Sequence, residues 1–157
     1  MPDSLNLSPR DVGAGRAIGG AAFLAVVLYF IWHLSKGYTS FGSPVIWAAI
    51  ILTPVVALGV ATTVWRVTMP DEPNPVYGAF AGGLAAGVSV SIFAALIGLV
   101  VGITESSADT LGGLVSDLFS FVVFFVAYGG VVTLPLFILV GAAVGYGYER
   151  HVARQSD

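Results

Sequence analysis

The chain contains no cysteine, and only 10% of its 157 residues are charged. The absence of cysteine excludes disulfides, thiolate-bound metals and cysteine nucleophiles within this sequence. The charged fraction is too small to cover the surface of a soluble globular protein of this length. A net charge of −3 argues against nucleic acid as a partner, because nucleic-acid binding requires clustered lysine and arginine.

Aspartate, glutamate, lysine and arginine are missing altogether from four long stretches, residues 17–34, 45–65, 76–103 and 118–148. A helix needs about 20 predominantly apolar residues to cross the ~30 Å hydrocarbon core of a bilayer, so each stretch can span it. The sequence therefore predicts an all-α polytopic membrane protein with four transmembrane helices in a bundle. We expect one transmembrane domain over residues 17–148, between a cytoplasmic N-terminal segment, 1–16, and a cytoplasmic tail, 149–157.

Lysine occurs once, at Lys36, against five arginines. With abundant alanine, valine and glycine, this usage resembles the composition of halophilic archaeal proteins, but it identifies no family. No convincing small-residue cleavage site follows residues 17–34. We therefore expect this stretch to be retained as the first span rather than removed as a signal peptide.

The basic residues predict the orientation in the cell membrane. In a four-span topology, five of the six lie on the side that both termini share with the loop 66–74: Arg10, Arg16, Arg66, Arg150 and Arg154. The positive-inside rule makes this side cytoplasmic. A fifth span, created by a break at residues 128–130, would divide the charges evenly, so four spans are favoured. Aromatic residues form the expected interfacial belts, with Trp32 and Trp47 outside and Trp65, Tyr77, Tyr146 and Tyr148 inside.

Local signals predict where helices begin. Ser8-Pro9, Ser43-Pro44 and Asn74-Pro75 each place a capping side chain before a proline, which is well suited to the first position of a helix. Ser8 followed by Asp11 resembles a capping box. Within residues 111–120, four apolar side chains share one helical face, which predicts a short interfacial helix before the fourth span: Leu111, Leu114, Val115 and Leu118.

No ionisable residue lies near the middle of any span, and this lowers the expectation of a proton- or sodium-coupled carrier. The two histidines, His33 and His151, are predicted on opposite sides of the membrane and so cannot jointly hold a haem or metal. The outer acidic residues Glu105, Asp109 and Asp117 have no accompanying nucleophile array. We therefore predict no catalytic, cofactor-binding or metal-binding residues.

Glycine gives the richest positive signal, with 20 residues in the chain. Pairs of glycine at i and i+4 let helix backbones approach closely, and this packing drives helix association in membranes. The five such pairs are Gly15/Gly19, Gly78/Gly82, Gly83/Gly87, Gly98/Gly102 and Gly141/Gly145. Three of them lie in the third span, which we therefore expect to be the central helix. Packing within one chain and packing between chains both fit these pairs.

Pro54 and Pro135 lie near the middle of the second and fourth spans, where proline kinks a helix. The sequence favours a small non-catalytic accessory or structural membrane subunit, which packs against other membrane subunits or a second copy through its glycine-rich faces. An alternative is a small channel or facilitator whose uncharged path is lined by Thr53, Ser89, Ser91 and Thr133. A weaker alternative is a membrane enzyme or cofactor-binding subunit.

Overall fold

The computed structural model describes residues 8–37 and 44–156, and this part of the chain is all-α. Five α-helices and one π-helical turn follow one another in this order: α1 (Pro9–Ser35), α2 (Pro44–Thr68), α3 (Pro75–Glu105), α4 (Leu111–Phe124), η1 (Phe125–Gly129) and α5 (Gly130–Ser156). The three proline-marked starts are confirmed, since α1, α2 and α3 begin at the expected prolines. Ser43, the predicted cap of α2, lies outside the described residues.

Two of the predicted caps are formed by side chains. The Asn74 side chain accepts hydrogen bonds from the backbone N–H groups of Val76 and Tyr77, at 3.0 and 3.3 Å. Ser8 and Asp11 form the reciprocal capping box, each accepting from the other's backbone N–H. These bonds satisfy amide groups that the first turn of a helix leaves without intrahelical partners.

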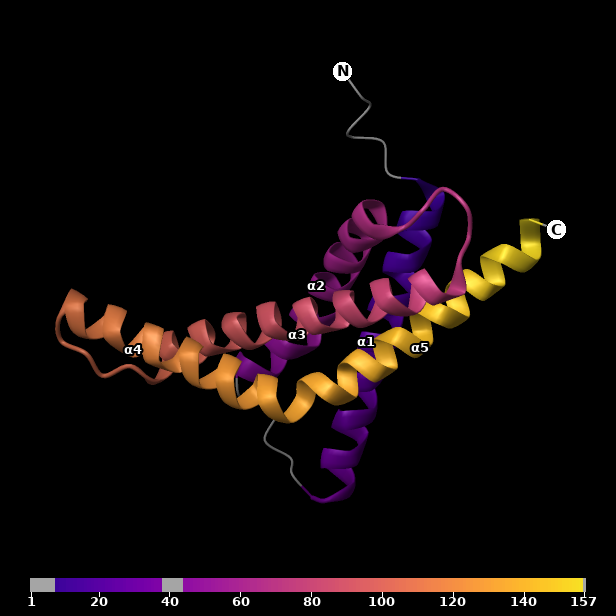
Figure 1. Cartoon of the computed structure of the whole chain (residues 1–157). Coiled ribbons are helices and arrows are strands. Elements are labelled where there is room, and N and C mark those ends of the chain that lie inside the picture. The colour runs from indigo at the N-terminus through magenta and orange to yellow at the C-terminus, as the bar shows by residue number, and fades with distance from the viewer. Residues whose placement is uncertain (1–7, 38–43, 157) are drawn as a thin grey trace.

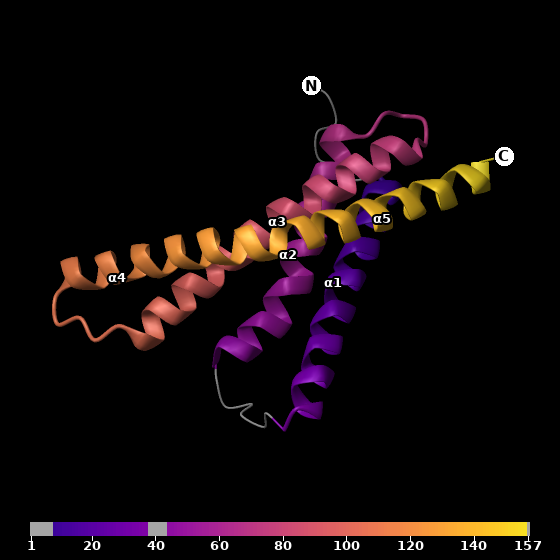
Figure 2. The ribbon, with the colours of Figure 1, turned by 60° about the horizontal axis from the view of Figure 1, so that its bottom comes forward.

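Four helical segments are long and apolar enough to cross a membrane, as the sequence predicts: Pro9–Trp32, Ile46–Thr68, Pro75–Glu105 and Leu111–Gly129. The fourth differs in position from the predicted stretch 118–148. The physical reason is that α4, η1 and α5, with 14, 5 and 27 residues, form one continuous helical rod of roughly 70 Å. Such a rod is about twice as long as the hydrocarbon core, so more than one part of it satisfies the length criterion. The chain does not reverse direction at residues 128–130 (Figure 2).

The helices form two antiparallel hairpins that meet at one end and diverge at the other (Figures 1 and 2). One hairpin is α1 with α2, and the other is α3 with the rod of α4, η1 and α5. The hairpins contact each other through α2 with α3 and through α1 with α5, near the N-terminus of α1. The closed bundle and the interfacial position of residues 111–120 remain predictions.

The buried core lies where the two hairpins cross. Most of its members are small apolar residues, and α1, α2 and α3 all contribute: Ala14, Ile18, Ala57, Ala61, Trp65, Ala81 and Ala85. Alanine at a crossing lets two helix axes approach closely, which is the packing expected in a membrane. Trp65 differs from the predicted interfacial belt, because its ring is fully buried in this core.

Candidate functional site

The Glu149 carboxylate lies at the centre of a polar junction between the two hairpins. Its side chain is fully buried, although it lies in the last quarter of α5 and at the start of the predicted cytoplasmic tail. One oxygen, Oε1, accepts from Arg10 Nε at 3.0 Å and from Trp65 Nε1 at 2.9 Å. The other, Oε2, accepts from Arg10 Nη2 at 2.5 Å and from the Asn74 backbone N–H at 3.3 Å. A carboxylate has about four acceptor positions, so all of them are occupied.

Arg10, in the first turn of α1, connects this carboxylate to the loop between α2 and α3. Its guanidinium presents Nε and Nη2 to Glu149, and this forked arrangement gives a strong, directional ion pair. Its Nη1 donates to the carbonyl oxygens of Pro70 and Asp71, at 2.8 and 3.2 Å. One side chain therefore ties the start of α1 to the proline-rich loop and to α5.

Two aromatic residues enclose the ion pair. The rings of Trp65 and Tyr148 meet edge to face, with centroids 6.2 Å apart. The Tyr148 hydroxyl donates to the backbone carbonyl of Arg10 at 2.9 Å. Gly13 makes room for this ring, because a Cβ at that position would overlap the Tyr148 hydroxyl. Both hairpins thus contribute aromatic surface that removes the charges from solvent.

The burial of Glu149 is compensated by its partners. A buried charge is costly unless it is paired and hydrogen-bonded, and Glu149 meets both conditions. Separation of the hairpins at this end would break the bonds from Arg10 and Trp65 to Glu149, so these bonds favour the observed crossing.

The sequence does not predict this junction. From the sequence, Arg10 indicates only the orientation and Glu149 only the start of the tail. The two residues are 139 positions apart, and nothing local pairs them. The available signal was that Arg10, Trp65, Asn74 and Glu149 all fall on the same predicted side of the membrane.

Four of the five glycine pairs pack so closely on another helix of the same chain that an added Cβ would crowd it. Gly78 and Gly82 on α3 meet Gly141 and Gly145 on α5 in a reciprocal contact. A Cβ at Gly82 would overlap the Gly141 carbonyl, and a Cβ at Gly145 would overlap the Gly78 carbonyl. The remaining two pairs face neighbouring helices: Gly15 and Gly19 pack on α2, and Gly98 and Gly102 pack on α4.

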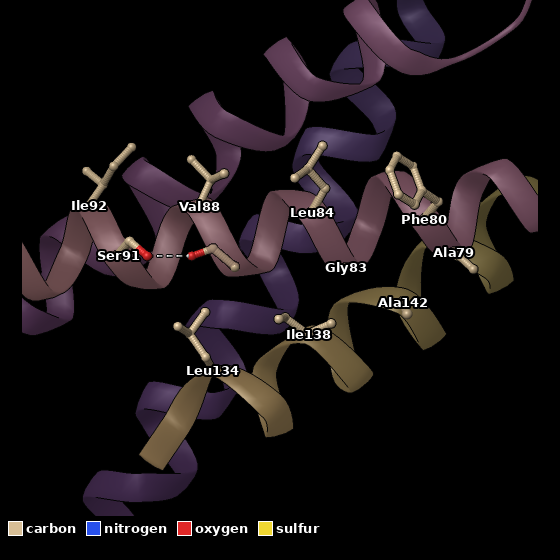
Figure 3. A pocket seen from close by; sticks show the side chains of 11 residues that line it. Ala79, Phe80, Gly83, Leu84, Val88, Ser91, Ile92, Leu134, Ile138 and Ala142 are labelled. Carbon is tan, nitrogen blue, oxygen red and sulfur yellow. Dashed lines mark hydrogen bonds between the residues drawn. The ribbon is translucent and has the colours of Figure 1, made fainter. Parts of the chain in front are cut away.

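The fifth pair, Gly83 and Gly87, lines an open groove between α3 and α5 (Figure 3). A Cβ at either position would make ordinary van der Waals contacts at 3.4–3.7 Å, chiefly with Ile138. The groove has a volume of about 690 Å³, and the hydroxyl of Ser91 is one of its few polar groups. That hydroxyl donates to the Gly87 carbonyl at 3.1 Å, so it is already satisfied.

The hydroxyl residues predicted to line a path lie on three different helices. Each donates to the carbonyl four residues earlier in its own helix, as hydroxyls inside membrane helices commonly do. Thr53 is on α2, Ser89 and Ser91 are on α3, and Thr133 is on α5. Ser89 is buried. Pro54 and Pro135 lie inside α2 and α5, which both continue as helices beyond them.

The acidic residues predicted on the outer side and the histidines form no cluster in the described part of the chain. Asp117 accepts a hydrogen bond from the Ser106 hydroxyl at 2.8 Å. His151 is hydrogen-bonded to Gln155 on the next turn of α5, and the His33 side chain lies outside the described residues. Among the residues that the structure describes, no three histidine, aspartate or glutamate side chains are placed to hold a metal ion.

Comparison with known proteins gave no match to a family model, to a curated protein or to a solved structure.

Proposed function

We propose that this chain is a small non-catalytic subunit of the cell membrane, which acts by packing with other membrane-embedded helices. The observation that carries this proposal is the surface left open by the diverging hairpins. The accessible surface of the chain is 9797 Å². A compact folded monomer of 16.2 kDa exposes about 7,500 Å². The excess of roughly 2,300 Å² exceeds the ~800 Å² that each partner buries in a standard protein interface.

The lengths of the helices fit two hairpins that both cross the membrane at a tilt. Helix α3 has 31 residues and is about 46 Å long, against ~30 Å of hydrocarbon. A helix of this length accommodates the core by tilting. We propose that the wedge between the hairpins is closed by helices of a partner, and that the bundle predicted from the sequence is completed in this assembly.

The proposed orientation places both termini in the cytoplasm. Five of the six basic residues support it through the positive-inside rule. The Arg10 contacts add independent support, because they bring the start of α1, the loop between α2 and α3, and the end of α5 together. The opposite end then carries the first turns of α4. There the exposed apolar side chains Leu111, Val115 and Phe119 share one face, which suits the outer membrane interface.

The decisive experiment measures the mass of the purified protein in a mild detergent, together with any membrane protein that co-purifies. The proposal expects a mass above 16.2 kDa, which is twice this value if the partner is a second copy and a different value if it is another membrane subunit. A monomer without protein partners would overturn it. Reconstitution into liposomes with a panel of small uncharged solutes tests the alternative channel, for which flux above that of empty liposomes is the expected result.

A further inference from the structure

We propose that η1 is a register device, which sets the rotation of α5 about its own axis and thereby brings Glu149 to Arg10. In this π turn, Phe125–Gly129, backbone hydrogen bonds span one residue more than in an α-helix. The turn therefore absorbs one residue of the chain. The same residues in α-helical form would rotate α5 by about 100° relative to α4, because an α-helix has 3.6 residues per turn.

The helices on both sides of the π turn are held against α3. On the α4 side, a Cβ at Gly98 would lie 2.7 Å from the Cα of Val122, so the two backbones are in contact there. On the α5 side, a Cβ at Gly82 would overlap the Gly141 carbonyl. Helix α3 is α-helical throughout the segment between Gly82 and Gly98. Both contacts can therefore exist together at only one rotation of α5 relative to α4.

The junction at the far end of α5 depends on the same rotation. A Cβ at Gly78 would meet both the Gly145 carbonyl and the Glu149 side chain, so this end of α5 is also held against α3. A rotation of about 100° would carry Glu149 more than a quarter of a turn away from its present direction. The carboxylate would then lose its donors Arg10 and Trp65.

The helical hydrogen-bond pattern is weakened around η1 by several features of the chain. Gly129 and Gly130 are adjacent, and Pro135 provides no N–H for the carbonyl four residues earlier. The Thr133 hydroxyl donates to the Gly129 carbonyl at 2.5 Å, a bond that often bends helices. The rod bends where α4 gives way to α5 (Figure 1). No residue of η1 is buried, so a change of length there disturbs little packing.

The first test deletes one residue at two matched places. Val126 in η1 and Val88 in α3 are valines that are 37% and 39% exposed. Deletion of Val126 should convert the π turn into α-helix and leave α5 in its present rotation, so we expect wild-type helicity and a thermal midpoint close to that of the wild type. Deletion of Val88 should lower the midpoint strongly, because it rotates Gly82 by about 100° relative to Gly98. Equal destabilisation by the two deletions would overturn the proposal.

The second test inserts one alanine between Val126 and Ala127. The π turn already holds one residue more than an α-helix, so a second extra residue should rotate α5 out of its contacts and lower the thermal midpoint. The comparison with the Val126 deletion separates register from a general tolerance of η1 to changes in length. If the insertion is as stable as the deletion, η1 is only a loosely packed segment and the proposal is wrong.

The third test asks whether η1 controls the junction, with Glu149→Gln as the probe. In the Val126 deletion, Glu149→Gln should lower the thermal midpoint by as much as it does in the wild type, because Arg10 still meets the carboxylate. In the alanine insertion it should lower the midpoint much less, because the junction is already lost. An equal effect in both backgrounds would contradict the link between η1 and Glu149. If the insertion does not fold, the deletion background decides, and loss of the Glu149→Gln effect there would overturn the proposal.

Discussion

Arg10 and Glu149 form a salt bridge between the first turn of α1 and the C-terminal part of α5, with Nη2 and Oε2 2.5 Å apart. The carboxylate is fully buried and the arginine side chain is 18% exposed. The bridge connects the two hairpins at the end where they cross.

Loss of the charge at Glu149 should destabilise the protein strongly. Glu149→Gln keeps the shape of the side chain but leaves Arg10 without its counter-ion in a largely buried position. Breaking a buried pair by removing one partner costs about 3–5 kcal/mol, and we expect a loss of free energy of unfolding of this order in detergent. Glu105→Gln, at the exposed end of α3, is the control and should change stability little. Equal stability of both variants would contradict the structural role of the junction.

The coupling between Arg10 and Glu149 can be measured separately. A double-mutant cycle with Arg10→Gln and Glu149→Gln should give a combined loss clearly smaller than the sum of the single losses. The reason is that each single change leaves the other group unpaired, whereas the double change leaves no unpaired charge. Additive losses would mean that the two side chains do not act on each other.

The indole of Trp65 donates to Glu149, and its ring also packs on Tyr148. Trp65→Phe retains an aromatic ring at the crossing but removes the Nε1–H donor. We expect a loss of roughly 1–3 kcal/mol, the cost of leaving one acceptor of a buried group without its donor. Tyr146→Phe removes a hydroxyl from an exposed side chain and serves as the control in the same thermal unfolding measurement. A stability equal to that of the control would show that the hydrogen bond contributes nothing.

The glycines of α3 should differ sharply in their tolerance of a side chain. Gly82→Leu should destabilise the protein by more than the ~1–3 kcal/mol typical of overpacking, because its Cβ would overlap the backbone of Gly141. Gly83→Leu should cost much less, since its Cβ makes contacts of 3.4 Å or more. Thermal midpoints in one detergent compare the two directly. The same midpoint for both variants would disprove the reciprocal packing of α3 on α5.

Reporter fusions test the topology. Fusions after Asp157 and within residues 66–74 should both report the cytoplasm, and a fusion within residues 105–110 should report the outside. The expectation follows from the five basic residues on one side and from the Arg10 contacts that join the ends of three elements there. An external C-terminus would eliminate the four-span topology and favour a break near residues 128–130.

The sequence by itself determined the features that depend on neighbouring residues. Uncharged stretches predicted four helices long and apolar enough to cross a membrane, although the fourth, Leu111–Gly129, is displaced from the predicted 118–148. Proline after a capping residue predicted the helix starts at Pro9, Pro44 and Pro75. Both signals operate over a few turns of chain, so they do not require knowledge of the fold. The sequence also identified every glycine pair, because the four-residue spacing is local.

Tertiary structure alone decided how these elements are paired. Gly82 faces Gly141, whereas Gly87 faces a groove. These positions depend on the rotation of each helix about its own axis, and that rotation is determined by side-chain contacts between segments that are distant in the sequence. The bond from Arg10 to Glu149 joins residues 139 positions apart, and only the crossing of the two hairpins brings them together. From the sequence, a charged residue such as Glu149 at the end of a predicted span is expected to be solvated. The structure shows that it is buried, with Trp65 and Asn74 as hydrogen-bond donors.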